Sequence, residues 1–150
     1  MKYILAATAL ILASPLVAFG QPVLGVWKPV EDVDVRGPDR GRHTTDVQPG
    51  LLIFTKQHYS ATYILGYSPR PRLSENPTDE ERGRVFQPFV ATAGTYAWND
   101  STMTLKASVA KNPAGMDGRG RTVQVRLQGD SLWFTIRAAD GTEEGTVKWV

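Results

Sequence analysis

The chain has 150 residues, of which 41% are hydrophobic, and its 17 lysines and arginines nearly balance its 15 acidic residues. This balance leaves no strongly basic surface and therefore argues against a nucleic-acid partner. The sequence contains no cysteine, which excludes disulfides and a lipid-modified N-terminal cysteine, so burial and hydrogen bonding must hold the fold.

The N-terminal stretch has the parts of a secretory signal peptide. A positive charge precedes an apolar run at 3–17, and the small residues Ala18 and Gly20 mark a cleavage site. A membrane-spanning helix is the alternative, but the run is shorter than the roughly 20 residues of a span and contains Pro15. We therefore expect a cleaved signal peptide at 1–20, a secreted or periplasmic protein, and no integral membrane segment after cleavage.

The mature domain, residues 21–150, opens with a strand predicted at 23–31. Residues 32–49 are polar and mixed in charge, a composition that predicts a long loop. Two β-branched and aromatic segments follow, 51–55 and 59–65, separated by a short polar break. This arrangement is typical of a β-hairpin.

One short helix is predicted at 77–86. Thr78 followed three residues later by Glu81 is a capping box, and acidic residues in the first turn favour the positive end of a helix. We expect Phe86, Phe89 and Val90 to anchor the end of this helix on the barrel or sheet.

The rest of the chain predicts further strands joined by tight turns. Apolar and polar residues alternate along them, as in strands with one buried face. These strands are expected at 91–98, 102–109, 121–127, 132–137 and 145–150. Together with the earlier segments they give eight strands in sequential order. The sequence therefore predicts an all-β protein, an eight-stranded antiparallel up-and-down β-barrel with one short helix.

Several segments carry a resemblance to a known family. Gly25-Val26-Trp27 looks like the Gly-x-Trp signature on the first strand of lipocalin-type barrels. Further similar segments are Gly50-Leu51-Leu52-Ile53-Phe54-Thr55, Tyr59-Ser60-Ala61, Ala93-Gly94-Thr95-Tyr96, Leu127-Gln128-Gly129-Asp130-Ser131-Leu132 and Lys148-Trp149. In this order they resemble the lipocalin-like domain family of bacteria and fungi, over essentially the whole mature chain.

The resemblance implies a calyx that is closed at one end, with the loop at 32–49 over its mouth. It also implies structural roles for Gly25 and for Trp27, which would pack across the closed end under Arg137 or Lys148 in a cation–π contact. The chain departs from secreted eukaryotic lipocalins because it lacks disulfides and a long C-terminal helix.

An eight-stranded barrel either fills its interior with side chains or holds one small ligand. The second alternative predicts a small apolar or amphipathic ligand in the interior, bound without a cofactor. The predicted ligand-binding residues are Phe54, Tyr59, Tyr63, Thr95, Arg126 and Phe134. Arg121 and Arg126 are both expected on the polar face of their strand, where a buried arginine would mark an anionic headgroup.

No catalytic or metal motif stands out. The two histidines, His43 and His58, are far apart in sequence, and a metal or acid–base site needs a second converging group. An enzyme remains an alternative, an isomerase or cyclase acting on a hydrophobic substrate, with Tyr63, Glu81 or His58 as candidate groups. A second alternative is a non-catalytic envelope interaction module that works through its outer face near Phe86.

Overall fold

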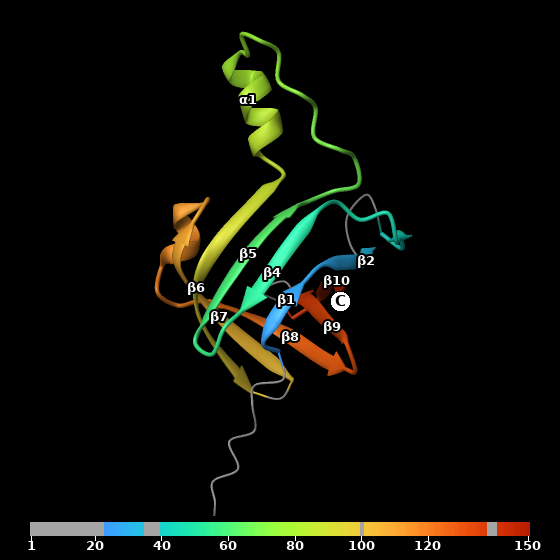
Figure 1. The fold of residues 1–150 in the computed structure, drawn as a ribbon, viewed down its shortest axis with the longest axis vertical. Coiled ribbons are helices and arrows are strands. Elements are labelled where there is room, and N and C mark those ends of the chain that lie inside the picture. The colour runs from blue at the N-terminus through green and yellow to red at the C-terminus, as the bar shows by residue number, and fades with distance from the viewer. Residues whose placement is uncertain (1–22, 35–39, 100, 138–140) are drawn as a thin grey trace, which may run out of the picture.

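A computed structural model describes residues 23–34, 40–99, 101–137 and 141–150 (Figure 1). The predicted signal peptide, residues 1–20, lies outside these ranges. Within them the sheet has ten strands. The strands are β1 (Gly25–Trp27), β2 (Pro29–Asp34), β3 (His43–Thr44), β4 (Gly50–Phe54), β5 (His58–Ile64), β6 (Phe89–Asn99), β7 (Thr102–Ala110), β8 (Arg121–Gln128), β9 (Ser131–Arg137) and β10 (Glu143–Trp149). The helices are α1 (Asp79–Phe86) and the short 3₁₀ helix η1 (Pro113–Met116).

The strands form one antiparallel sheet in the order β1-β4-β5-β6-β7-β8-β9-β10-β2-β3. A single residue, Lys28, separates β1 from β2, and it exchanges two backbone hydrogen bonds with Val150, at 2.7 and 2.9 Å. β1 pairs with β4, whereas β2 pairs with β10. The first segment of the domain therefore links the two sides of a curled, barrel-like sheet.

The all-β class and the sequential antiparallel pairing are confirmed, but the predicted number of eight strands differs from the ten observed. The segment predicted as one strand at 23–31 is divided at Lys28 into β1 and β2. The predicted loop at 32–49 also contributes, because β2 continues to Asp34 and β3 pairs with it. Aspartate is a poor strand former, and here the backbone of β10 supplies the pairing that overrides this preference.

The core follows from strand alternation. Leu52, Met103 and Leu132 are fully buried, and they come from three different strands. The other buried hydrophobic residues are Val23, Trp27, Phe54, Tyr59, Ala61, Val123, Val125, Phe134 and Trp149. Since alternate positions of a strand face opposite sides, these residues define the inner face of the curled sheet.

The capping box of α1 is confirmed. The Thr78 hydroxyl accepts from the Glu81 amide, and the Glu81 carboxylate accepts from the Thr78 amide at 2.7 Å. The helix nevertheless buries none of its residues and projects beyond the end of the sheet (Figure 1). The predicted anchoring through Phe86 is wrong, since this side chain is 56% exposed. In the described part of the chain, no helix combines the length and the apolar character that crossing a membrane requires.

Candidate functional site

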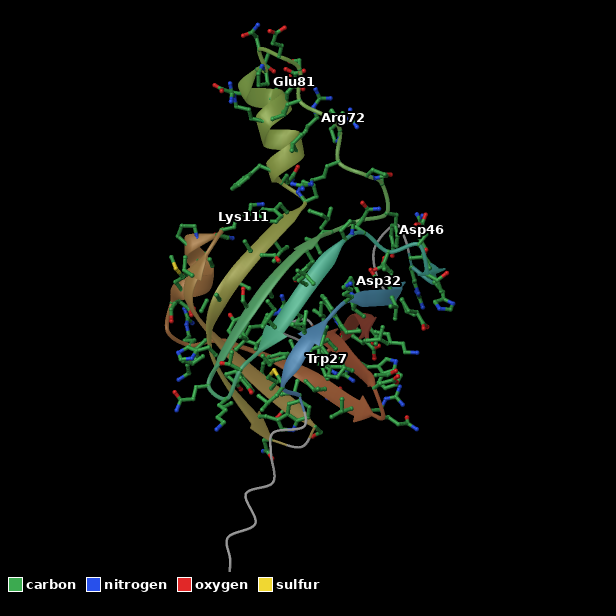
Figure 2. All side chains as sticks on the ribbon, in the orientation of Figure 1. Trp27, Asp32, Asp46, Arg72, Glu81 and Lys111 are labelled. Carbon is green, nitrogen blue, oxygen red and sulfur yellow. The ribbon has the colours of Figure 1, made fainter. Side chains whose placement is uncertain are left out.

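The inner face of the sheet is tightly packed at the end that lies away from α1. Trp27 is found there, paired with Leu52 across β1 and β4 (Figure 2). Trp27 is 8% exposed, and its indole Nε1 donates to the carbonyl of Val23 at 2.8 Å. This end of the interior is therefore closed by side chains, with its buried polar group satisfied.

The end toward α1 is more open and more polar. Tyr63 alternates on β5 with the buried Tyr59 and Ala61, so it faces the interior, yet it is only partly buried. Its ring meets that of Trp149 edge to face, with centroids 6.0 Å apart. Burial raises the pKa of the Tyr63 phenol, while the positive charge of Arg121 acts in the opposite direction. Tyr63 is therefore a neutral hydrogen-bonding group at neutral pH.

Arg121 also faces this end of the interior. It pairs directly with Leu105 of β7, and Leu105 packs against the core. Directly opposed residues of an antiparallel pair point to the same face. The expectation that Arg121 and Arg126 share one polar face is therefore wrong, because the two positions have opposite parity along β8.

Two carboxylates on β2 complete the polar end of the interior. Asp32 pairs with Val147, which packs against the core, and Asp34 pairs with Gly145 two positions further along. Burial is the main cause that raises the pKa of Asp32 above its ordinary 3.8, and the negative charge of Asp34 adds to it.

Asp34 belongs to a small cluster at the same edge. The Tyr67 hydroxyl donates to its carboxylate, and the guanidinium carbon of Arg42 lies 3.6 Å from the centre of the Tyr67 ring. The segment predicted as a lid over the mouth therefore contributes Asp32 and Asp34 to the sheet, and Arg42 to its edge.

Trp149 occupies the middle of the interior, between the packed end and the polar end. Its ring contacts Tyr63 and also Phe134, whose centroid is 6.4 Å away. The side chain is 4% exposed, and its indole Nε1 is a buried polar atom without a hydrogen-bond partner among the described residues. An unsatisfied buried N–H is costly, typically about 1–3 kcal/mol.

Three of the six predicted ligand-binding residues belong to the packed core. Phe54 and Phe134 are buried and contact each other at 6.4 Å between centroids. Tyr59 is buried, and its hydroxyl lies 2.9 Å from that of Thr92. Tyr63, described above, is the member of the set that lines the accessible end. Thr95 is exposed on β6 and lies outside this group.

Basic residues that were expected in the interior or over Trp27 lie on the outer face of the sheet. Arg126 was predicted to bind ligand, and Arg137 or Lys148 was predicted to stack on Trp27. The guanidinium carbon of Arg126 lies 3.8 Å from the centre of the Trp133 ring, and the Lys148 ammonium lies 5.3 Å from it. Arg137 instead donates to the carbonyl of Gly141 at 2.9 Å. The structure thus places Arg126 and Lys148 on Trp133, because strand alternation turns them away from the side that holds Trp27.

The residues considered for acid–base chemistry do not converge. The Nε2 atom of His43 lies 2.7 Å from the Oε1 atom of Glu31 at the surface. His58 is exposed beside the β4–β5 turn. Glu81 caps α1, and its hydrogen bond from the Thr78 amide is the main cause that lowers its pKa. Among the described residues, no three histidine or acidic side chains gather to hold a metal ion.

Sequence reasoning missed Asp32, Arg121 and Trp149 as interior residues. Arg121 precedes the buried Val123 and Val125 by two and four positions, so the alternation of side chains along β8 already indicated that Arg121 faces the interior. Asp32 carried no such signal, because its position inside depends on the pairing of β2 with β10.

No protein-family model matches the chain, and no curated protein matches it. Among solved structures, the chain is similar to the crystal structure of an uncharacterized protein from Bacteroides eggerthii DSM 20697 at 2.60 Å resolution. The two have 12% sequence identity and a TM-score of 0.43, over 83% of this chain and 98% of the other. These comparisons assign neither a family nor a function to the chain.

Proposed function

We propose that this protein binds a small amphipathic molecule at the polar, accessible end of its curled sheet. The observation that carries the proposal is the contrast along the interior. Inward-facing residues near Trp27 are buried, whereas Tyr63 and Asp32 face inward and remain partly exposed. A ligand site needs an apolar wall with a few polar groups that fix orientation, and this end supplies both.

The groups at this end favour a ligand with an apolar body and a polar head. The partly exposed ring of Tyr63, packed on the buried Trp149, offers apolar surface, and Asp32 and Arg121 supply groups of opposite charge at the same end. The neutral Tyr63 hydroxyl is available to donate a hydrogen bond to the ligand. Phe54 and Phe134 support this wall from the core and do not contact the ligand in this proposal.

The family and the route of export are separate proposals. An eight-stranded lipocalin-like barrel is compatible with the sheet if β1 and β2 count as one strand broken at Lys28 and the two-residue β3 is set aside. The separate proposal for export is that the signal peptide at 1–20 is removed and that the mature protein works outside the cytoplasm. Mass spectrometry of the protein from its own host would test this through a mature N-terminus at Gln21.

Binding is tested with a dansylated fatty acid, whose fluorescence increases in an apolar site. Val90 pairs with Tyr63 across β5 and β6, so Val90→Trp adds bulk to the accessible end of the interior. Thr62 is the exposed neighbour of Tyr63, so Thr62→Trp adds the same bulk outside and serves as the matched control. We expect wild type and Thr62→Trp to bind alike, and Val90→Trp to bind at least about tenfold more weakly, which is roughly 1.4 kcal/mol.

Two results would overturn the proposal. One is a wild-type protein that leaves the fluorescence of the probe unchanged. The other is equal binding by Val90→Trp and Thr62→Trp, because the probe would then occupy a site outside the sheet. Native mass spectrometry of protein purified from its own host adds an independent readout, in which a co-purified small molecule is expected.

A further inference from the structure

The accessible end of the interior carries three hydrogen-bond donors without partners. The indole Nε1 of Trp149 is buried and unsatisfied among the described residues. Within the same ranges, neither the Tyr63 hydroxyl nor the Arg121 guanidinium forms a hydrogen bond or an ion pair. Buried polar groups are nearly always satisfied, so the unsatisfied indole N–H indicates a partner from outside the chain.

The three donors lie close to one another although they come from three strands, β5, β8 and β10. The rings of Tyr63 and Trp149 meet edge to face, with 6.0 Å between their centroids. The positive charge of Arg121 acts to lower the pKa of the Tyr63 phenol, against the larger effect of burial. Because a charge acts strongly only over short distances, Arg121 lies near the phenol. Tyr63 therefore connects the buried indole to Arg121, which is exposed at the rim.

Two of these three groups can only donate. An indole N–H and a guanidinium have no acceptor atom, and the guanidinium also carries a permanent positive charge. A carboxylate is complementary to such a set, because its two oxygens accept several hydrogen bonds and match the fork of an arginine. The donor set therefore favours a ligand with an anionic head over one with a cationic or a neutral head.

The carboxylates of β2 do not neutralise Arg121. Asp32 and Asp34 belong to the same end of the interior, yet neither forms an ion pair with Arg121 in the described structure. The charge that raises the pKa of Asp32 is that of Asp34. These two carboxylates also limit the charge of the ligand. A phosphate monoester carries about −1.5 to −2 charges at pH 7, so they would repel it more strongly than a carboxylate with one charge.

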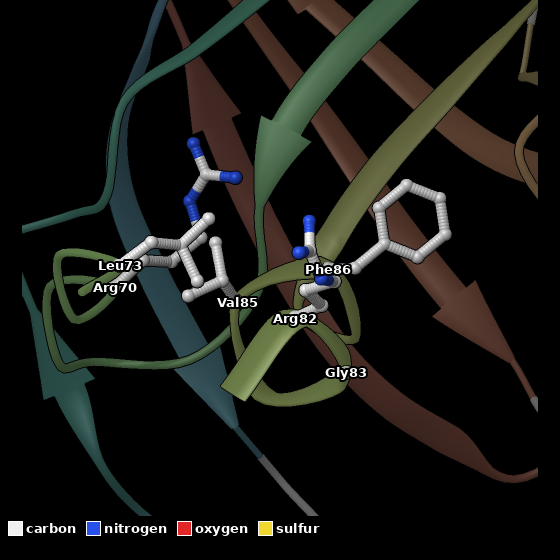
Figure 3. Close-up of a pocket in the computed structure, with 6 residues that line it drawn as sticks. All are labelled: Arg70, Leu73, Arg82, Gly83, Val85 and Phe86. Carbon is white, nitrogen blue, oxygen red and sulfur yellow. The ribbon is translucent and has the colours of Figure 1, made fainter. Parts of the chain in front are cut away.

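A hollow elsewhere on the surface lacks this combination. It lies on the arm, the segment of residues 65–88 that leaves the sheet after β5 and returns to it at β6 (Figure 1). The hollow measures about 340 Å³ and is lined by Arg70, Leu73, Arg82, Gly83, Val85 and Phe86 (Figure 3). Its arginines already have neighbours, since Arg82 lies 3.9 Å from the Asp79 carboxylate and Arg70 lies over the Phe89 ring. Helix α1 buries none of its residues, so it offers no buried donor to a ligand.

We propose that the ligand is a monocarboxylate with an apolar chain, whose carboxylate binds the Arg121 guanidinium, the Tyr63 hydroxyl and the Trp149 indole N–H. The carboxylate lies beside Tyr63, which both other donors approach. It gives the buried indole N–H the acceptor that the described part of the fold does not supply. This inference rests on the proposed function and specifies the chemical class of its ligand.

Competition against the dansylated fatty acid tests the charge of the head. Decanoate, decanol and decyltrimethylammonium share one chain length and differ in the charge of the head. We expect decanoate to displace the probe at a concentration at least about tenfold lower than decanol, and decyltrimethylammonium to be the weakest competitor. If the probe binds and either other compound displaces it as well as decanoate, the carboxylate site is wrong while ligand binding stands. If the probe does not bind, the proposed function fails, and this inference fails with it.

Two arginine variants test the cation. Arg121→Gln should weaken decanoate binding at least about tenfold and leave decanol binding unchanged, at about 0.15 M salt, where distant charges are screened. Arg126→Gln is the matched control, because it makes the same change in charge on the same strand, but outside the sheet, where Arg126 stacks on Trp133. It should bind decanoate as wild type does. Equal losses in the two variants, or no loss in Arg121→Gln, would overturn the proposal.

The indole N–H of Trp149 gives a direct spectroscopic readout. In a proton–nitrogen correlation spectrum, Trp149→Phe identifies this signal among those of the four tryptophans. We expect decanoate to move the Trp149 signal downfield, as a new hydrogen bond does. The Trp27 signal should stay in place, because that indole already donates to the Val23 carbonyl. A Trp149 signal that does not respond to saturating decanoate would remove the indole from the site and overturn the proposal.

Discussion

The same substitution at two buried tryptophans should have very different costs. Trp27 and Trp149 are 8% and 4% exposed, and both belong to the core. The Trp27 indole donates to the buried carbonyl of Val23, whereas the Trp149 indole N–H has no partner among the described residues. Replacing each by phenylalanine keeps an aromatic ring in place and removes the N–H.

The magnitude follows from two terms. Phenylalanine buries on the order of 50 Å² less than tryptophan, which amounts to about 1.3 kcal/mol at either position. Trp27→Phe also loses a hydrogen bond worth about 1 kcal/mol and leaves the Val23 carbonyl unsatisfied at about 1–3 kcal/mol. Trp149→Phe instead removes an unsatisfied donor and so recovers the roughly 1–3 kcal/mol that burying this donor costs. We expect Trp27→Phe to lose about 3–5 kcal/mol, and Trp149→Phe to lie between a loss of about 0.3 kcal/mol and a gain of about 1.7 kcal/mol.

Urea denaturation followed by far-ultraviolet circular dichroism measures both values. Fluorescence is unsuitable, because the chain has four tryptophans and the substitutions alter the signal itself. The m-values should match that of wild type, so that the midpoints report stability alone. If Trp149→Phe costs as much as Trp27→Phe, then Trp149 donates a hydrogen bond in solution and the reasoning from burial is refuted.

Three further predictions test the sheet, the site and the helix. Gly94→Ala should lower the free energy of unfolding by more than about 3 kcal/mol, measured by urea denaturation. A Cβ atom at this position would collide with the carbonyl oxygen of Lys106 and lie 2.8 Å from the amide nitrogen of Ser108. A denaturation midpoint close to that of wild type would contradict the β6–β7 register. Asp32→Asn should remove part of the pH dependence of the free energy of unfolding. Burial penalises the ionised carboxylate of Asp32 and raises its pKa, so the wild-type protein loses stability as pH rises from about 3.8 through that raised pKa. The variant has no carboxylate at this position and should not show this loss. Equal pH profiles for wild type and variant would place Asp32 in solvent. Thr78→Ala should reduce the stability of α1 by about 1 kcal/mol, because the helix loses its N-cap. Amide hydrogen exchange within the helix should become roughly fivefold faster, while the free energy of global unfolding is retained. Unchanged exchange would contradict the capping box.

The periodicity of the sequence was sufficient for much of the fold. Alternation along β8 and β9 placed Val123, Val125 and Phe134 on one face, and the structure buries all three. The helix cap at Thr78 was equally local, since its donor and acceptor lie three residues apart. Such features depend on near neighbours in the chain, so they are visible without knowledge of the tertiary structure.

The candidate site was only partly predictable. The aromatic composition of β5 indicated Tyr63, and the structure places it at the accessible end of the interior. Arg126 has the same charge as Arg121 and lies on the same strand, yet it stacks on Trp133 outside. Only the parity of each residue relative to the buried positions separates the two, and composition does not contain that information.

The sequence by itself determined the all-β class, the order of the hairpins and the start of α1, because period-two burial and capping act between residues that are close in the chain. Tertiary structure alone decided that β2 extends to Asp34, which brings Asp32 inside, and that the arm stands free of the sheet. Both outcomes depend on which distant backbone pairs with the segment. β10 offers hydrogen-bond partners to β2 from more than 100 residues away, whereas none of the described strands and helices covers the exposed face of Phe86.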